Sequence, residues 1–128
     1  MKRQNISSHG KFEASVGYSR AVRVGNFIYV SGTGATDPEG NLVGIGDIYL
    51  QTKQILKNIE WGLKQAGATL QDVVRTRMYV TDMSQWEGAG RAHGEIFHAI
   101  RPASLLVEVK SLVMPEMLIE IEADAVIL

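Results

Sequence analysis

The chain has 128 residues, no cysteine and a formal charge of −1, from 13 basic and 14 acidic side chains. This length predicts a single domain, residues 1–128, with a hydrophobic core of its own. The balanced charge argues against general attraction to nucleic acid or an anionic membrane, the missing cysteine excludes disulfides, and no apolar run is long enough to cross a bilayer. We therefore expect a soluble cytoplasmic protein.

Two strands are predicted early in the chain. Residues 21–25 and 27–31 are predicted to be two strands, and the Gly25-Asn26 pair between them tolerates positive φ, which predicts a hairpin. A further short strand is expected near residues 4–7. The run Asp37-Pro-Glu-Gly40 predicts a turn.

Two amphipathic helices are predicted in the middle of the chain. From Asp47 the apolar period lengthens to that of a helix, which Gly67 should end. Residues 73–80 alternate again and predict a strand that places Val74 with the buried set and Val73 with the open one. Thr81 and Asp82 are N-cap residue types, so a second helix should follow them, with an apolar stripe that includes His93.

The last quarter of the chain, residues 101–110 and 118–128, alternates with a period of two and predicts two more strands. Two helices can cover only one face of such a sheet, so we expect an α+β two-layer domain with a mixed sheet. The uncovered face should carry Arg23, Tyr29, Arg75, Arg77, Tyr79, Leu106, Glu108, Glu120, Glu122 and Asp124. This mixture of tyrosine, leucine and both charges predicts a face that packs on copies of itself; a solvated face with charge pairs is the alternative.

Few residue patterns point to chemistry. The run Ser31-Gly-Thr-Gly34 lacks the lysine of a phosphate loop, but Gly32 could still bring a ligand close to the backbone. The three histidines lack metal-ligand spacing, so no metal site is predicted. Arg75 and Arg77 are better explained by ion pairs with the last strand than by RNA contacts.

Glu120 is the most interesting carboxylate because it lies within a strand, between two isoleucines that point to the other face. If subunits close over this side chain, its pKa would rise and Glu120 could act as a general acid or hold a water molecule. A structural salt bridge with an arginine is the alternative, and the strand pattern does not choose between the two.

Several motifs carry a resemblance to a known family: Gly17-Tyr18, the run from Gly25 to Gly32, Val73 to Asp82, Arg101-Pro-Ala103, and Ile119-Glu-Ile-Glu-Ala123. With them the chain resembles the reactive intermediate deaminase (RidA, YjgF-like) superfamily over nearly its whole length. The resemblance implies a chorismate-mutase-like fold and a homotrimer, in which the sheets form a central barrel and small molecules bind in clefts between subunits.

The resemblance also implies a reaction and its residues. Family enzymes hydrolyse enamines and imines to carbonyl compounds and ammonia without a cofactor. Carried over by motif, Tyr18, Ser31, Gly32 and Glu120 would line the cleft, and Leu106 would offer a backbone group.

One family residue is missing, because the arginine that usually follows Pro-Ala is Ser104 in this chain. A serine hydroxyl cannot replace the bidentate, charged contact that a guanidinium makes with a carboxylate. We therefore expect either that another arginine enters the cleft, with Arg20 preferred over Arg101, or that the ligand is not an amino-acid-derived carboxylate.

Three functions remain for this sequence. The first is an imine or enamine deaminase with altered substrate choice. The second is a non-catalytic homotrimer that binds a small metabolite or a partner protein in the same cleft. The third, RNA cleavage or inhibition of translation, is disfavoured by the neutral charge and the lack of an aromatic and basic platform.

Overall fold

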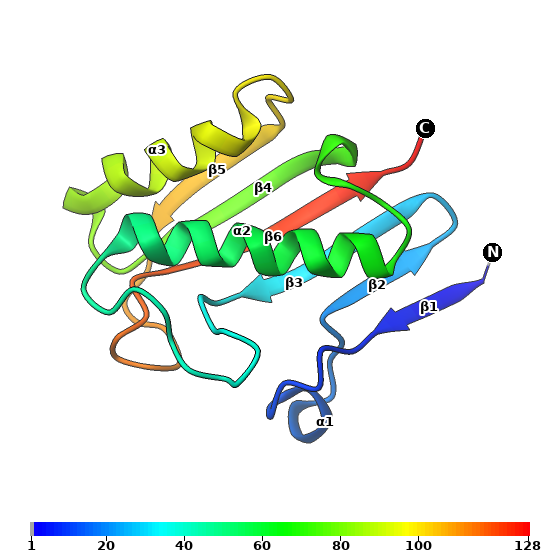
Figure 1. Cartoon of the computed structure of the whole chain (residues 1–128), viewed down its shortest axis with the longest axis horizontal. Coiled ribbons are helices and arrows are strands. Elements are labelled where there is room, and N and C mark those ends of the chain that lie inside the picture. The colour runs from blue at the N-terminus through cyan, green and yellow to red at the C-terminus, as the bar shows by residue number, and fades with distance from the viewer. Residues whose placement is uncertain (1) are drawn as a thin grey trace.

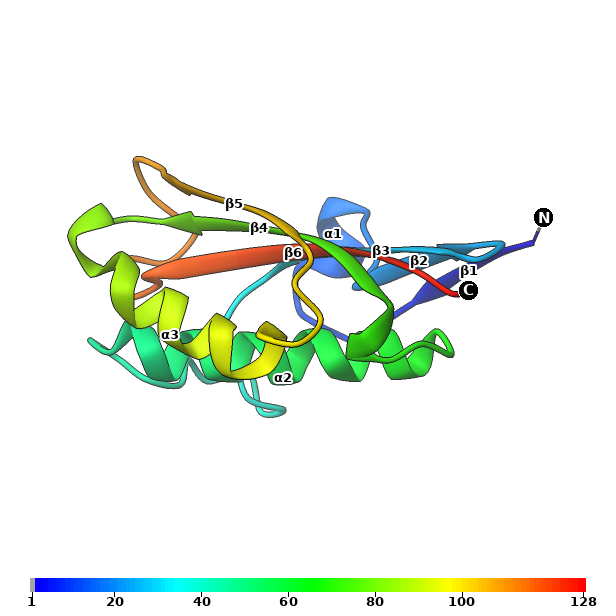
Figure 2. The ribbon, with the colours of Figure 1, turned by 90° about the horizontal axis from the view of Figure 1, so that it is seen from above.

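The computed structural model describes residues 2–128, which form two layers, a six-stranded sheet and two long helices. The sheet order is β1-β2-β3-β6-β4-β5, with β4 and β5 parallel and all other neighbours antiparallel. Figure 2 shows both helices on one face of the sheet, which confirms the predicted α+β fold. The elements are β1 (Arg3–Ile6), α1 (Glu13–Val16), β2 (Ala21–Val24), β3 (Phe27–Thr33), α2 (Ile48–Gln65), β4 (Val73–Val80), α3 (Trp86–Phe97), β5 (Ala103–Glu108) and β6 (Ile119–Val126).

The helix α2 packs across the middle of the sheet (Figure 1). The Asp47 side chain caps its first turn by accepting a hydrogen bond from the Leu50 N–H at 3.1 Å, and Gly67 leaves it at φ 87°. Its apolar stripe forms the core with the inner faces of β3 and β6; Ile28, Ile55, Leu56, Ile59, Leu63, Ile119 and Ile121 are fully buried. None of the helices within residues 2–128 is long and apolar enough to span a membrane.

Arg23 does not lie on the open face as predicted. Its strand neighbour across the hairpin is the buried Ile28, and its Nη1 donates to the Ala66 carbonyl at 2.7 Å. Ala66 is the C-cap of α2, where the last carbonyl groups lack helical partners. The register of β2 therefore places Arg23 on the helix side, with Ala21 and Ile28, and there its guanidinium caps the C-terminal end of α2.

The second long helix begins later than predicted. The Asp82 side chain accepts a hydrogen bond from Ser84 N–H at 3.0 Å and caps a short 3₁₀ turn, Met83–Gln85, before α3 starts at Trp86. A similar 3₁₀ turn, Leu70–Asp72, leads into β4. Neither turn was foreseen, because three-residue elements leave no periodic pattern in a sequence.

Two β-bulges change which side chains are buried. In β4 the register shifts between Val73 and Arg75, so Val73 is 3% exposed and Val74 is 47% exposed, the reverse of the prediction. In β3 the register shifts between Val30 and Thr33, and both of these side chains are buried although they are three residues apart. Each bulge inserts one residue and reverses the alternation beyond it.

The prediction was also wrong for β5. Its register with β4 places Leu106 beside Met78 and Glu108 beside Val80, so both lie on the helix side instead of the open face. The Glu108 carboxylate accepts a hydrogen bond from the Met83 N–H at 2.8 Å. Because this edge strand carries leucine or valine on both faces, alternation alone could not tell which face the helices cover.

On the open face of the central strands, side chains of neighbouring strands form ion pairs and a hydrogen bond. Arg77 Nη1 lies 3.2 Å from Asp124 Oδ2 and 3.8 Å from Glu122 Oε1, and the Tyr79 hydroxyl donates to Glu122 at 2.5 Å. These contacts confirm the interpretation of Arg77 as an ion-pair residue, whereas Arg75 forms no ion pair within residues 2–128 and the interpretation was wrong for it. The same face leaves three large apolar side chains about half exposed, Phe27, Tyr29 and Leu105.

Candidate functional site

The Glu120 carboxyl group lies directly against Gly32. Glu120 is the second residue of β6, opposite Tyr79, and Gly32 lies in the β3 bulge. A methyl group added at Gly32 would stand 2.2 Å from Glu120 Oε1, so only a glycine leaves room for the carboxyl group. The structure thus brings these two predicted site residues into contact.

Arg20 joins the same group from the segment before β2. Its Nη2 donates to the Gly32 carbonyl at 3.1 Å and its Nη1 to Thr33 Oγ1 at 3.5 Å. Its guanidinium also lies 5.6 Å from the centre of the Tyr18 ring. Within residues 2–128, its buried Nε has no hydrogen-bond partner. The hydrogen bonds of Arg20 therefore mainly stabilise the β3 bulge.

The environment of Glu120 favours its protonated form. Burial raises the pKa of this carboxyl group, the nearby Arg20 guanidinium lowers it, and the Glu122 carboxylate raises it further, with a net upward shift. A carboxyl group that keeps its proton nearer to neutrality can donate that proton to a reacting nitrogen and accept one from water.

Glu13 anchors the segment that carries Tyr18, a role that the sequence gave no reason to expect. Its buried carboxylate accepts hydrogen bonds from Ser7, Ser8 and Gly10, and its carbonyl accepts the N–H of Tyr18 at 3.0 Å. Burial opposes ionisation of Glu13, but these hydrogen bonds outweigh it and lower its pKa. A lone glutamate among serines is too common a pattern to have indicated this clamp.

Ser31 serves the backbone of this group. Its hydroxyl donates to the Ser19 carbonyl at 2.6 Å, and its N–H donates to the Arg20 carbonyl at 3.0 Å. These bonds tie the β3 bulge to the segment that leads from Tyr18 into β2. We refer to Tyr18, Arg20, Ser31, Gly32 and Glu120 as the glutamate group.

The other predicted residues lie elsewhere in the subunit. Ser104 and Leu106 are on the edge strand β5, which is separated from β3 by β6 and β4. Three strand spacings amount to about 14 Å, too far for Ser104 and Gly32 to contact one small ligand from the same subunit. Arg101 precedes β5 with φ 55° and lines a depression of about 250 Å³ beside α3.

Ser104 is hydrogen-bonded into the helix side of the sheet. Its hydroxyl lies 2.8 Å from Thr76 Oγ1, which in turn lies 2.9 Å from His93 Nε2 on α3. Thr76 is fully buried and His93 is partly buried, and burial lowers the pKa of His93. His93 is thus hydrogen-bonded on the apolar stripe of α3, and the neutral imidazole can either donate to Thr76 or accept from it.

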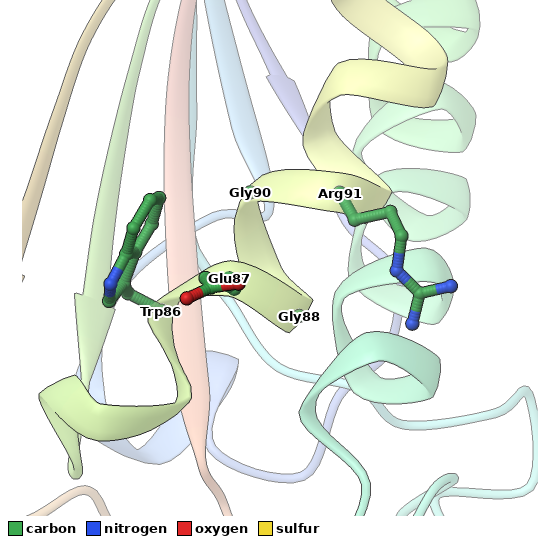
Figure 3. Close-up of a pocket in the computed structure, with 5 residues that line it drawn as sticks. All are labelled: Trp86, Glu87, Gly88, Gly90 and Arg91. Atoms are coloured by element: carbon green, nitrogen blue, oxygen red, sulfur yellow. The ribbon is translucent and has the colours of Figure 1, made fainter.

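A larger depression of about 610 Å³ lies at the start of α3, lined by Trp86, Glu87, Gly88, Gly90 and Arg91. In Figure 3 the Trp86 and Arg91 side chains point away from each other, so they do not converge on a ligand. None of the predicted site residues lines this depression. Within residues 2–128, no three histidine, aspartate or glutamate side chains gather where they could hold a metal ion.

Comparison with known proteins settles the family. The sequence model described as "Endoribonuclease L-PSP" matches residues 9–127. The chain belongs to this family. A RutC family protein of Pyrococcus abyssi is 42% identical over 84% of both chains. The 3-aminoacrylate deaminase RutC of Acinetobacter baylyi is 34% identical over 84% of this chain and 85% of its own length.

The solved structures agree with the L-PSP family assignment. A crystal structure of a YjgF/YER057c/UK114 family member from Mycobacterium tuberculosis has a TM-score of 0.90 and 48% identity, and it covers 98% of this chain and 100% of that one. The YjgF protein of E. coli has a TM-score of 0.83 at 29% identity. The predicted family and fold are both confirmed.

For this L-PSP family chain, the sequence resemblance found most residues of the glutamate group. It did not find Glu13, nor the Thr76 and His93 contacts behind Ser104. Of the two arginines expected to replace the missing one, Arg20 lies within the glutamate group and donates to the Gly32 carbonyl, and Arg101 lines the depression beside α3. That either of them binds the ligand stays a prediction.

Proposed function

We propose that this L-PSP family protein hydrolyses imines or enamines to a carbonyl compound and ammonia, with Glu120 as the acid–base group and no cofactor. The partly buried Glu120 carboxyl group, packed on Gly32 with a raised pKa, is the observation that carries the proposal. The family relative named 3-aminoacrylate deaminase supports the reaction class.

The chemistry needs only water and one proton-transfer group. Protonated Glu120 donates to the imine nitrogen while water adds to the carbon, so a C–O bond forms and the π electrons move to nitrogen. The carboxylate left behind takes the proton that the added water loses. Return of that proton to nitrogen makes ammonia the leaving group. The C–N bond then breaks while the hydroxyl oxygen forms the C=O bond and gives its proton to the Glu120 carboxylate, which restores the acid. An enamine first takes a proton on carbon and loses one from nitrogen to become the imine.

We further propose that the protein is a homotrimer whose clefts combine the glutamate group of one copy with Ser104 and Leu106 of another. The separation of about 14 Å within one subunit supports this arrangement. The half-exposed Phe27, Tyr29 and Leu105 on the open face support burial of that face between copies.

The reaction is tested with 2-aminoacrylate generated in situ, by following the release of ammonia and keto acid. Glu120→Gln should lower the catalysed rate by roughly 10²- to 10⁴-fold, the usual contribution of a general acid or base. Glu95→Gln is the matched control, because Glu95 bonds Tyr49 on the outer surface of the helices. A wild-type rate equal to that in buffer, with several amino-acid precursors, would contradict the proposal.

The shared cleft is tested by mixing two inactive variants. Glu120→Gln removes the proton-transfer group, and Ser104→Trp fills the opposite wall. After denaturation and refolding together in equal amounts, about a quarter of the clefts should receive two intact walls, because each cleft draws each wall independently. Light scattering checks that both variants assemble; recovery of no activity from assembled mixtures would argue against a shared cleft.

A binding function without turnover is the second candidate, and Ser104 favours it because the usual arginine is missing. Tight binding of a small metabolite with no hydrolysis, unchanged by Glu120→Gln, would support it. RNA cleavage, which the description of the family model names, is less consistent with the ion pairing of Arg77. Cleavage of RNA that persists through purification and is lost with Glu120→Gln would revive it.

A further inference from the structure

The hydrogen bonds behind Ser104 form a continuous chain from the edge of the sheet to α3. Ser104 Oγ, Thr76 Oγ1 and His93 Nε2 are linked at 2.8 and 2.9 Å. Thr76 is fully buried, whereas Ser104 is exposed in the isolated subunit, so the chain has one protected centre and one accessible end. We call these three residues the hydroxyl relay.

We propose that the hydroxyl relay makes this wall of the cleft select a neutral polar group, such as a carboxamide or a hydroxyl, in place of a carboxylate. The inference rests on the proposed function, since it assumes that Ser104 faces the substrate cleft. It names the substrate class: imines and enamines whose polar substituent carries no charge.

The charges around the relay support a neutral ligand. Arg20 lies on the opposite wall of the proposed cleft, where it donates to Gly32 and Thr33, and Arg77 is paired with Asp124 on the open face. The charged group farther along the same side of β5 is the Glu108 carboxylate, which would repel an anion. A carboxylate beside Ser104 would therefore lose its hydration shell without gaining a cation on its own wall of the cleft.

The relay suits a carboxamide because it can run in either direction. A neutral His93 accepts from Thr76 through one tautomer and donates to it through the other, and each hydroxyl passes the direction on. Ser104 can thus present either a lone pair to an amide N–H or a proton to an amide oxygen. A carboxylate only accepts hydrogen bonds, so it can pair with Ser104 only when the serine hydroxyl donates.

The test compares two ketones of matched shape, 2-oxobutanoate and 2-oxobutanamide, which mimic the products of charged and neutral substrates. Calorimetric titration of the assembled protein should show the amide binding at least about tenfold more tightly. Ser104→Arg should reverse this preference, because a guanidinium binds the carboxylate bidentately.

Two variants of Thr76 separate the relay from simple packing. Thr76→Val keeps the shape but removes the central hydroxyl, and it should weaken amide binding by about 3- to 10-fold while leaving acid binding unchanged. Thr76→Ser keeps the hydroxyl and should retain the preference. Ser104→Ala tests the same contact if Thr76→Val does not assemble, as judged by light scattering.

Three results would overturn the relay: equal or tighter binding of the acid by the wild type, the same preference in Thr76→Val as in Thr76→Ser, or no binding of either ketone. Because neither ketone turns over, these results are independent of the hydrolysis assay. A deaminase that prefers 2-oxobutanoate would refute the relay alone. An intact amide preference without hydrolysis of either 2-aminoacrylate or its carboxamide would refute only the proposed reaction.

Discussion

Replacing Gly32 by alanine should disable the proposed reaction while leaving the fold nearly intact. The new methyl carbon would stand 2.2 Å from Glu120 Oε1, whereas ordinary contacts begin at 3.4 Å. The carboxyl group must therefore move by about 1 Å or rotate away. The backbone of Gly32 has no positive φ, so alanine itself fits the strand.

Gly32→Ala should change the free energy of unfolding only slightly and the rate of hydrolysis strongly. The atom in the way is the far end of a flexible side chain, so we expect the free energy of unfolding to fall by no more than about 1 kcal/mol. A displacement of about 1 Å in a proton-transfer group commonly lowers a rate by roughly 10²-fold. The loss should thus appear in catalysis far more than in stability.

Hydrolysis of 2-aminoacrylate and thermal unfolding measure the two effects side by side. Gly90→Ala is the control, because Gly90 lies inside α3 with only the Trp86 ring near its missing methyl group, at 3.8 Å. It should keep full activity and gain slightly in stability. If Gly32→Ala retained more than half of the wild-type rate, Glu120 could not be working from the position seen here.

Three further predictions concern single side chains. Burial raises the pKa of Glu120, so its ionisation lowers the stability of the folded protein as pH rises from the unfolded to the folded pKa. Glu120→Gln should therefore become more stable relative to the wild type over that pH range. Urea unfolding between about pH 4 and pH 8 measures the difference. The pKa of Glu13 is lowered, so its contribution to stability is present above the unfolded pKa and is lost as pH falls through the folded pKa. Glu13→Gln should therefore destabilise the protein at neutral pH, and this loss of stability should shrink as the pH is lowered. The same urea unfolding assay measures it. Arg23→Met should lower the free energy of unfolding by about 1–2 kcal/mol, because the Ala66 carbonyl loses its donor, without changing the rate of hydrolysis.

Periodicity was sufficient to predict the long elements of this fold. Strand 73–80, the helix that starts at Asp47 and the strand through Glu120 were confirmed because each buries one face against a continuous core. Prediction failed where charge misled the choice of face or where a bulge interrupts alternation. Arg23 lies on the same side of β2 as the buried Ala21, although its charge suggested the open face, and the bulge at Val74 reverses the alternation before it.

The candidate site was only partly accessible from the sequence. Family motifs pointed to Glu120 and Gly32, but no motif could show that the Glu120 carboxyl group lies against the Gly32 backbone, because the contact depends on a bulge and on the register of β3 against β6. The relay behind Ser104 was invisible for a similar reason. Thr76 and His93 are distant in sequence, and only the parallel pairing of β4 and β5 beneath α3 brings them to Ser104.

The position of the two walls explains how a family reaction could be kept while its substrate changes. Glu120 and Gly32 lie on central strands, and their geometry depends on the bulge in β3 and on the Arg20 hydrogen bonds. Ser104 lies on the edge strand, three strand spacings away, where a change of side chain leaves those contacts untouched. In the proposed cleft, a serine at this edge would alter which group a ligand must carry, whereas the proposed proton-transfer step, which depends on the central strands, would be preserved.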